Sequence, residues 1–383
     1  MRMKTKLFSN IRLKKPKPKT MILSIILILV IVGLIYINSH PPIRHSIIRF
    51  FNPDYTPIEY QMSIKDTEAT LFERVGDNVL LLSGEGLVIT DETLDKKVFA
   101  NRAGSKPQIK STKDNYIQFF SGSKTVFVND GSETKEIICD NNVITATINK
   151  NGYYAIATDE KGYKALITVY NTRDEEIFKW HSADNFVLGL ALSPDNKSLA
   201  TSMIHFGNDK QSNLLTVFKF SEEKPVSSAE INSNFVAEIK YISSSKILVI
   251  GSEEMMMYSP KGDKIWNVSY DGEKLVNYSV NDNYIAIANR SSSALLGSCM
   301  INIYDYSGRK ISETDHPEDI VDMDTAGDNI LITSKKSIRI ITKSGKETNN
   351  IKFAKDIKHG LLFGNTGYAA IVTGNVLHSV KID

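Results

Sequence analysis

Hydrophobic and polar positions alternate along most of this chain in short runs of about five residues. From residue 58 onward, each β-branched or aromatic run follows a turn of Asn, Asp, Gly or Ser, and no helical spacing of apolar residues persists. Eight such turn-and-strand units recur at intervals of roughly 40 residues, starting near residues 78, 115, 152, 196, 246, 283, 329 and 367. A repeat of that length is typical of the blades of a β-propeller.

Each unit divides into four strands: one before the turn, one after it, a third such as 165–170 and a more polar fourth such as 176–181. Strands covered on both faces are continuously apolar, whereas an outer edge strand carries polar and charged residues. The sequence therefore predicts an all-β, eight-bladed propeller over residues 58–383, with a seven-bladed ring as the alternative. The eighth unit lacks a fourth strand, and we expect residues 58–64 to supply it and close the ring.

The N-terminal part follows a different pattern. Met21 to Ile37 form an uncharged run of seventeen residues, which predicts one transmembrane helix over residues 21–38. A cleaved signal peptide is the alternative, but residues 37–42 contain no small-x-small cleavage site. Pro41 and Pro42 end the helix and begin a juxtamembrane stalk over residues 39–57.

Charge predicts the orientation of this helix. Residues 1–20 form a basic tail with eight Lys and Arg residues and no acid. The positive-inside rule places this tail in the cytoplasm and the propeller outside the cell membrane. The residues that we assign to membrane topology are Lys14, Lys15, Lys17 and Lys19.

Composition excludes several classes of function. The formal net charge of +2 hides an acidic body, because all 44 Asp and Glu residues follow residue 53, and such a body argues against nucleic-acid binding. Two cysteines cannot form a disulfide framework, and none of the seven histidines has the i, i+4 spacing of a helical zinc pair. The acidic stretch 315–324 lacks the glycine and the terminal glutamate of a calcium loop. We therefore predict no catalytic residue, no metal and no cofactor.

Three insertions between second and third strands, at residues 159–163, 205–213 and 290–299, are the most informative irregularity. In a propeller these loops emerge on one face, where insertions commonly form a binding surface, although drift in tolerant loops is the alternative. Apolar residues in loops exposed to solvent favour a binding role. The predicted partner-binding residues are Tyr163, His205, Phe206, Asn208, Asp209, Arg290, Leu295 and Leu296.

Two local patterns resemble known propeller repeats. The segment 258–266 (YSPKGDKIW) is similar to the quinoprotein-type repeat, in which a tryptophan after a glycine turn docks adjacent blades. The turn 193–197 (SPDNK) resembles those of WD-repeat propellers. The layout of the whole chain resembles an uncharacterised family of single-pass, membrane-anchored propellers of low-GC Gram-positive bacteria.

The insertions on one face of the predicted ring favour a function in binding. The propeller would act as an extracytoplasmic scaffold that binds an envelope protein or a glycan, attached to the lipid bilayer by its helix. The alternative is an enzyme that uses the funnel of the ring, either a quinone-dependent dehydrogenase or a hydrolase. The charged positions with which quinone enzymes surround their cofactor have no match in this sequence, so the scaffold is the preferred interpretation.

Overall fold

The computed structural model describes residues 18–39, 57–64, 71–83, 86–100, 106–207, 211–291 and 297–382, together with positions 47 and 51. The chain divides into two compact units, Met1–Tyr55 and Thr56–Asp383. The first contains helix α1 (Pro18–Ser39), which confirms helical structure over the predicted residues 21–38. A helix with both the length and the apolar character needed to cross a membrane is not found among the described residues. Lys14, Lys15 and Lys17 lie outside the described residues, and the side chain of Lys19 is not described.

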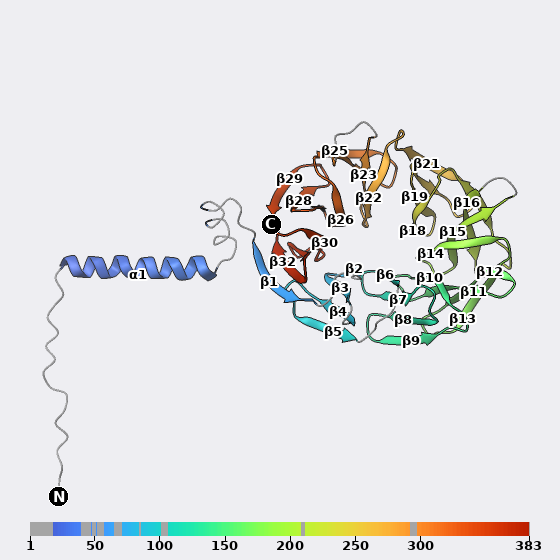
Figure 1. The fold of residues 1–383 in the computed structure, drawn as a ribbon, viewed down its shortest axis with the longest axis horizontal. Helices are drawn as coiled ribbons and strands as arrows, with labels where there is room; N and C mark the ends of the chain where they lie inside the picture. Colours follow the sequence, from blue (N-terminus) through green and yellow to red (C-terminus); the bar gives the residue numbers. More distant parts are fainter. Residues whose placement is uncertain are drawn as a thin grey trace, which may run out of the picture. The chain divides into compact units, whose positions relative to one another are not determined.

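The second unit consists of eight antiparallel four-stranded sheets arranged as a ring of blades (Figure 1). In blades 1 to 7 the four strands follow one another in sequence. Their bounds are, for blade 1, β2 (Leu71–Val75), β3 (Asn78–Ser83), β4 (Gly86–Thr90) and β5 (Lys96–Ala100); for blade 2, β6 (Pro107–Ser111), β7 (Tyr116–Phe120), β8 (Thr125–Asn129) and β9 (Thr134–Ile138); for blade 3, β10 (Val143–Ile148), β11 (Tyr154–Glu160), β12 (Tyr163–Tyr170) and β13 (Glu176–Ser182); for blade 4, β14 (Asn185–Leu192), β15 (Ser198–Phe206), β16 (Gln211–Lys219) and β17 (Ser227–Ile231); for blade 5, β18 (Val236–Ser243), β19 (Lys246–Gly251), β20 (Glu254–Tyr258) and β21 (Lys264–Ser269); for blade 6, β22 (Lys274–Val280), β23 (Ile285–Arg290), β24 (Cys299–Tyr304) and β25 (Lys310–His316); and for blade 7, β26 (Ile320–Ala326), β27 (Asn329–Ser334), β28 (Ser337–Thr342) and β29 (Glu347–Lys352).

Blade 8 is assembled from both ends of this unit. Its strand order is β1-β32-β31-β30, with β1 (Ile58–Ser63) as the outer strand beside β30 (Ile357–Leu362), β31 (Tyr368–Thr373) and β32 (Val376–Lys381). β1 pairs antiparallel with β32, and the hydroxyl of Tyr368 donates to Glu59 Oε2 at 2.7 Å. The predicted closure by residues 58–64 is therefore confirmed, and the seven-bladed alternative is wrong.

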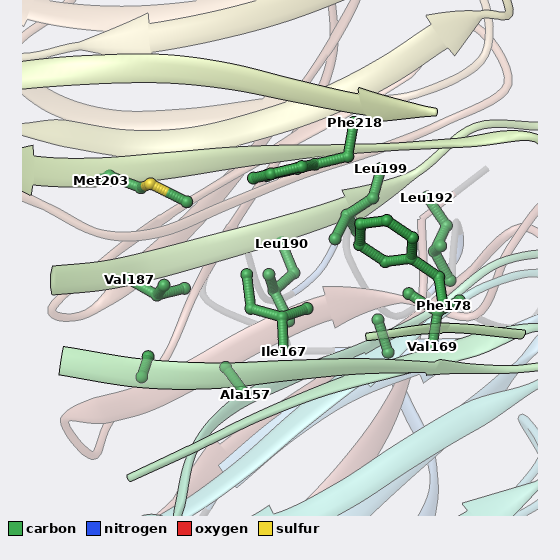
Figure 2. Packing of buried hydrophobic residues seen from close by; sticks show 12 residues of the cluster. Ala157, Ile167, Val169, Phe178, Val187, Leu190, Leu192, Leu199, Met203 and Phe218 are labelled. Carbon is green, nitrogen blue, oxygen red and sulfur yellow. The ribbon is translucent and has the colours of Figure 1, made fainter. Parts of the chain in front are cut away.

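Each of the eight junctions between neighbouring blades contains its own cluster of buried apolar residues. At the junction of blades 3 and 4, the ring of Phe178 from blade 3 lies against Leu199 and Phe218 of blade 4 (Figure 2). Second and third strands such as β19 and β20 are buried along nearly their whole length because neighbouring blades cover both of their faces. The continuous apolar runs of the sequence therefore have their cause in the packing of blade on blade.

Trp266 docks blade 5 on blade 6 in the way that the quinoprotein-type repeat implies. Its indole Nε1 donates to the carbonyl oxygen of Tyr306 at 3.3 Å. Its ring also covers Gly308, which has a φ of +82°, and a Cβ atom added to that glycine would lie 2.9 Å from Trp266 Cδ2. The turn of blade 6 therefore requires glycine both for its backbone conformation and for the space that the indole occupies.

Gly308→Ala is accordingly expected to lower the free energy of unfolding by roughly 2–4 kcal/mol, because the left-handed backbone and the clash with Trp266 both oppose a side chain. Chemical denaturation measures this loss. The matched control is Gly122→Ala, since Gly122 has a similar φ of +84° but no neighbouring atom within 4 Å of an added Cβ. If both substitutions cost the same, the docking of Trp266 on the turn contributes nothing to stability.

His316 and His378 are buried, with exposed fractions of 3% and 8%. Nε2 of His316 lies 2.8 Å from Ser334 Oγ, Nε2 of His378 lies 2.8 Å from Thr373 Oγ1, and Nδ1 of each ring has no hydrogen-bond partner. Burial lowers the pKa of both imidazoles, because a charged ring loses its hydration inside the fold.

This predicts a loss of stability in acid. Below about pH 6.5 the unfolded chain binds protons at these rings more readily than the folded chain does, so the free energy of unfolding falls as the pH drops from 6.5 towards the lowered pKa. The loss between pH 6.5 and 5.5 is at most about 1 kcal/mol for each histidine. Denaturation curves of the wild type and of His316→Gln/His378→Gln at the two pH values isolate this contribution. An equal pH dependence in the two proteins would contradict it.

Candidate functional site

The blades present two chemically different ends, and the predicted binding residues belong to one of them. Because the four strands of a blade alternate in direction, the connections between second and third strands emerge at the same end as the connections from one blade to the next. We call this end the hairpin face. It contains the segments 159–164, 181–186, 205–207 and 230–235 of blades 3 to 5.

The structure corrects the prediction that two of the insertions are loops. His205 and Phe206 lie in β15, which pairs with β16 up to Phe206 opposite Gln211. Tyr163 is the first residue of β12 and pairs with Glu160, so only Lys161 and Gly162 form the turn. The described residues of these two insertions lengthen the hairpins, because extra residues on both arms can continue the antiparallel ladder.

The third insertion gives a different result. Arg290 ends β23, and its guanidinium pairs with Asp319 of the connection to blade 7 and donates to Cys299 Sγ at 3.4 Å. It is therefore engaged within the fold. Of the remaining predicted residues, Asn208, Asp209, Leu295 and Leu296 lie outside the described residues.

The tips of the hairpins in blades 3 and 4 form a cluster of exposed rings. Tyr163 lies against His181, with ring centroids 4.7 Å apart. Phe186 meets the edge of Phe206 at 5.7 Å, and the ammonium group of Lys164 lies 4.8 Å from the centroid of Phe186. The cluster therefore continues from blade 3 to blade 4 by ring–ring and cation–π contacts.

Blade 5 adds a further exposed ring at the same end. Phe235 is 58% exposed and Phe206 is 59% exposed, while Leu188, Phe186 and Tyr163 are between 40% and 46% exposed. We call these five residues the aromatic face. Large apolar side chains exposed in adjacent blades are unusual for a monomeric surface and are typical of an interaction site.

A repeated hydrogen bond holds this end of blades 3 to 5. In each blade an asparagine just before or at the start of the first strand forms a hydrogen bond with a residue near the tip of the hairpin between the second and third strands. The three pairs are Asn141 with Glu160, Asn185 with His205 and Asn234 with Glu253, and they occupy equivalent positions in the pairing of first and second strands. The distances are 2.8, 2.9 and 2.6 Å. We call these contacts the asparagine clamps. They tie the connection between blades to the tip of the hairpin, so that Phe186 and Phe235, each directly after a clamp asparagine, stand on a fixed backbone.

Glu253 shows how firmly the third clamp is built. Its carboxylate accepts hydrogen bonds from the hydroxyls of Ser233 and Ser252 and from the backbone and side-chain amides of Asn234. Burial acts to raise the pKa of Glu253, but these hydrogen bonds outweigh it and hold the pKa below its usual value. The group is therefore ionised at neutral pH. It also lines a pocket at the junction of blades 5 and 6, together with Ser252, Ser269, Gly272, Glu273, Lys274 and Leu275.

Sequence reasoning missed Phe186, Leu188 and Phe235. A signal was available, because the tripeptide Asn-Phe-Val occurs at 185–187 and again at 234–236. In both copies the valine is buried between blades and the phenylalanine is exposed (Figure 2 shows Val187). Leu188 is exposed because it lies in a β-bulge between Val187 and Gly189, and an irregularity of that kind leaves no pattern in the sequence.

The inner strands contain a second set of charged residues. Arg74 of blade 1 pairs with Asp324 of blade 7, Ser111 donates to Glu73 Oε1 at 2.9 Å, and the hydroxyl of Tyr278 donates to Glu238 Oε2 at 3.0 Å. Burial raises the pKa of Glu73. Each of these carboxylates forms a hydrogen bond or ion pair with a residue of a blade other than its own. Within the described ranges, no group of three or more His, Cys, Asp or Glu side chains has a metal-binding arrangement. Their geometry supports a structural role between blades.

The comparisons with known proteins agree with this fold. A family model described as "Family of unknown function (DUF5711)" matches residues 52–382. No curated protein matches the chain in sequence. Among solved structures, BamB from Moraxella catarrhalis has a TM-score of 0.52 at 9% identity, covering 85% of this chain and all of its own. Sqt1 from Saccharomyces cerevisiae has a TM-score of 0.56 at 9% identity, covering 85% and 98%. Apo AztD from Citrobacter koseri has a TM-score of 0.50 at 12% identity, covering 82% and 90%.

Proposed function

The chain belongs to the DUF5711 family of unknown function, and we propose that its propeller is a scaffold that binds a protein partner through the aromatic face. The observation that supports this most directly is the continuous contact from Lys164 through Phe186 to Phe206, exposed on two adjacent blades. Aromatic side chains dominate the binding energy of protein interfaces, because they bury a large area with few rotatable bonds.

The asparagine clamps support the same function. A surface that is ordered before binding loses less conformational entropy when the partner arrives. Three clamps at equivalent positions of three consecutive blades fix the hairpin tips in that way. Recognition on this surface would need no chemical step. Because the carboxylates of the inner strands already have partners within the fold, we do not propose an enzyme that uses the funnel of the ring.

We further propose that helix α1 attaches the scaffold to the cell membrane, with the propeller outside. The support is the sequence: an uncharged run from Met21 to Ile37, preceded by eight basic residues. Alkaline carbonate extraction of membranes tests the anchor, and a membrane-impermeant maleimide directed at Ser228→Cys tests the orientation. Release of the chain by carbonate, or labelling only after the cells are opened, would contradict this part of the proposal.

The binding function is tested with Phe206→Ser/Phe235→Ser in the full chain. Because both rings are more than half exposed, we expect an unchanged melting temperature and loss of at least 90% of the partner that co-purifies with the wild type, as removal of two hot-spot residues would cause. The matched control is Ile265→Ser/Ile311→Ser, two exposed apolar residues at the start of outer strands, 48% and 43% exposed. Full retention of the partner by the first variant would refute the proposal.

A further inference from the structure

The charges around the aromatic face are strongly unequal in sign. Among the described residues on the hairpin face of blades 3 to 5 and at their junction with blade 6, three lysines accompany seven carboxylates. The lysines are Lys161, Lys164 and Lys274, and the carboxylates are Asp159, Glu160, Asp184, Glu230, Glu253, Asp271 and Glu273.

Several of these carboxylates have no ion-pair partner among the residues that the structure describes. The described part of the chain offers no ion pair to Asp184, Glu253, Asp271 or Glu273, since no Lys, Arg or His nitrogen lies within 4.0 Å of them. Lys164 instead lies over the ring of Phe186. We call these four carboxylates the acidic border of the aromatic face, and none of them has an ion-pair partner among the described residues.

The pocket between blades 5 and 6 concentrates this charge. Glu253 and Glu273 line it together with one ammonium group, that of Lys274, and Asp271 is part of the same connection, so carboxylates outnumber cations there. The carboxylate of Glu253 is held in place by Ser233, Ser252 and Asn234, and the exposed ring of Phe235 directly follows Asn234. An apolar contact and a fixed negative charge thus lie within a few residues of each other.

Resting on the proposed function, we propose that the partner binds through a basic, aromatic-containing protein segment. Its apolar side chains pack on Phe206 and Phe235, and a Lys or Arg side chain enters the pocket beside Glu253 and Glu273. Complementary charge speeds association and selects the partner, while the buried rings supply most of the affinity. A negatively charged glycan or an acidic protein would meet repulsion at this border.

A random dodecapeptide library, selected on the purified full chain and counter-selected on Phe206→Ser/Phe235→Ser, tests the chemistry of the partner. Peptides that depend on the aromatic face should have a net positive charge and at least one aromatic residue. If the peptides that depend on the aromatic face are neutral or acidic, the inference of a basic segment is wrong, and the proposed function is unaffected. A library without any face-dependent peptide would overturn both this inference and the proposed protein partner. Self-association of the chain that the double variant abolishes would overturn the inference alone.

The role of the acidic border is measured with the consensus peptide from that selection. Asp184→Asn/Asp271→Asn/Glu273→Gln removes three charges outside the clamps and should weaken binding about tenfold at low salt. The matched control Glu133→Gln/Glu222→Gln/Glu223→Gln removes three charges from connections between third and fourth strands, at the opposite end of the blades, and should change the affinity less than twofold. Equal affinities for the two variants would overturn the inference.

Discussion

Deletion of residues 57–64 is expected to cost roughly 5 kcal/mol of unfolding free energy and to lower the melting temperature by more than 10 °C. The segment contributes the outer strand β1 of blade 8 and three apolar side chains, of which Ile64 is 3% exposed and Ile58 and Met62 pack against the neighbouring clusters. Each such side chain contributes about 1.5–3 kcal/mol when fully buried. Because a domain of this kind has a total stability of only about 5–15 kcal/mol, the ring would be close to unfolding.

The control for this deletion is Tyr60→Ser, which changes a side chain of the same strand that is 40% exposed. Its melting temperature should lie within about 2 °C of the wild type, because surface substitutions rarely cost more than about 0.5 kcal/mol. Circular dichroism follows both variants. A deletion variant that melts together with the wild type would show that β32 does not need β1 and that the ring is closed by other contacts.

Arg74→Met is expected to cost about 3–5 kcal/mol, since it leaves a buried carboxylate without its partner. Arg74 Nη1 lies 2.8 Å from Asp324 Oδ2, and its Nη2 donates to the carbonyl oxygen of Thr325 at 2.9 Å. The same oxygen of Asp324 accepts from the amide of Leu362 in blade 8 at 2.9 Å. Three blades therefore meet at one carboxylate, which belongs to the inner strand of blade 7 and contacts the inner strands of blades 1 and 8.

The pH dependence of this variant supplies its control. Burial raises the pKa of Asp324, and the Arg74 guanidinium opposes that rise. Without the guanidinium, the folded-state pKa lies further above the unfolded value of about 3.9, so the penalty is fully present above the folded pKa and shrinks as the pH falls through it. Denaturation at pH 7.5 and pH 5 should show this recovery, and Arg74→Met/Asp324→Asn should regain at least half of the loss at pH 7.5. If Arg74→Met lowers the free energy of unfolding by less than about 1 kcal/mol at pH 7.5, the Arg74–Asp324 ion pair contributes no more than an ordinary surface pair.

Much of the fold could be predicted from the sequence because each blade repeats the same physical requirement. Second and third strands lie between two neighbours, so runs such as 247–250 must be apolar on both faces, and that requirement recurs in every blade. The closure by residues 58–64 could be predicted because this strand has no blade of its own, while the last blade lacks its fourth strand. Pairing the two is the arrangement that completes the ring. Trp266 was recognised for a similar reason, since its glycine turn is local in sequence.

The candidate site was predicted only in part. Tyr163 and Phe206 are exposed at the predicted end of the blades, and their role in binding stays a prediction. Phe186 and Phe235 belong to connections between blades, where apolar residues are expected to start the next strand. The clamps join residues nineteen or twenty positions apart, such as Asn185 and His205, and the pairing depends on a register that a β-bulge shifts. Arg290 could not be assigned because its partner Asp319 belongs to another blade connection.

Site-specific photocross-linking in living cells tests most directly whether the aromatic face is the binding surface. A photoreactive phenylalanine analogue replaces Phe206 or Phe235 on the aromatic face, or Ile265 or Ile311 on outer strands, in the otherwise unchanged full chain. We expect positions 206 and 235 to cross-link to the same protein, and positions 265 and 311 to give no adduct with it. Adducts confined to positions 265 and 311, with none at 206 or 235, would contradict the account.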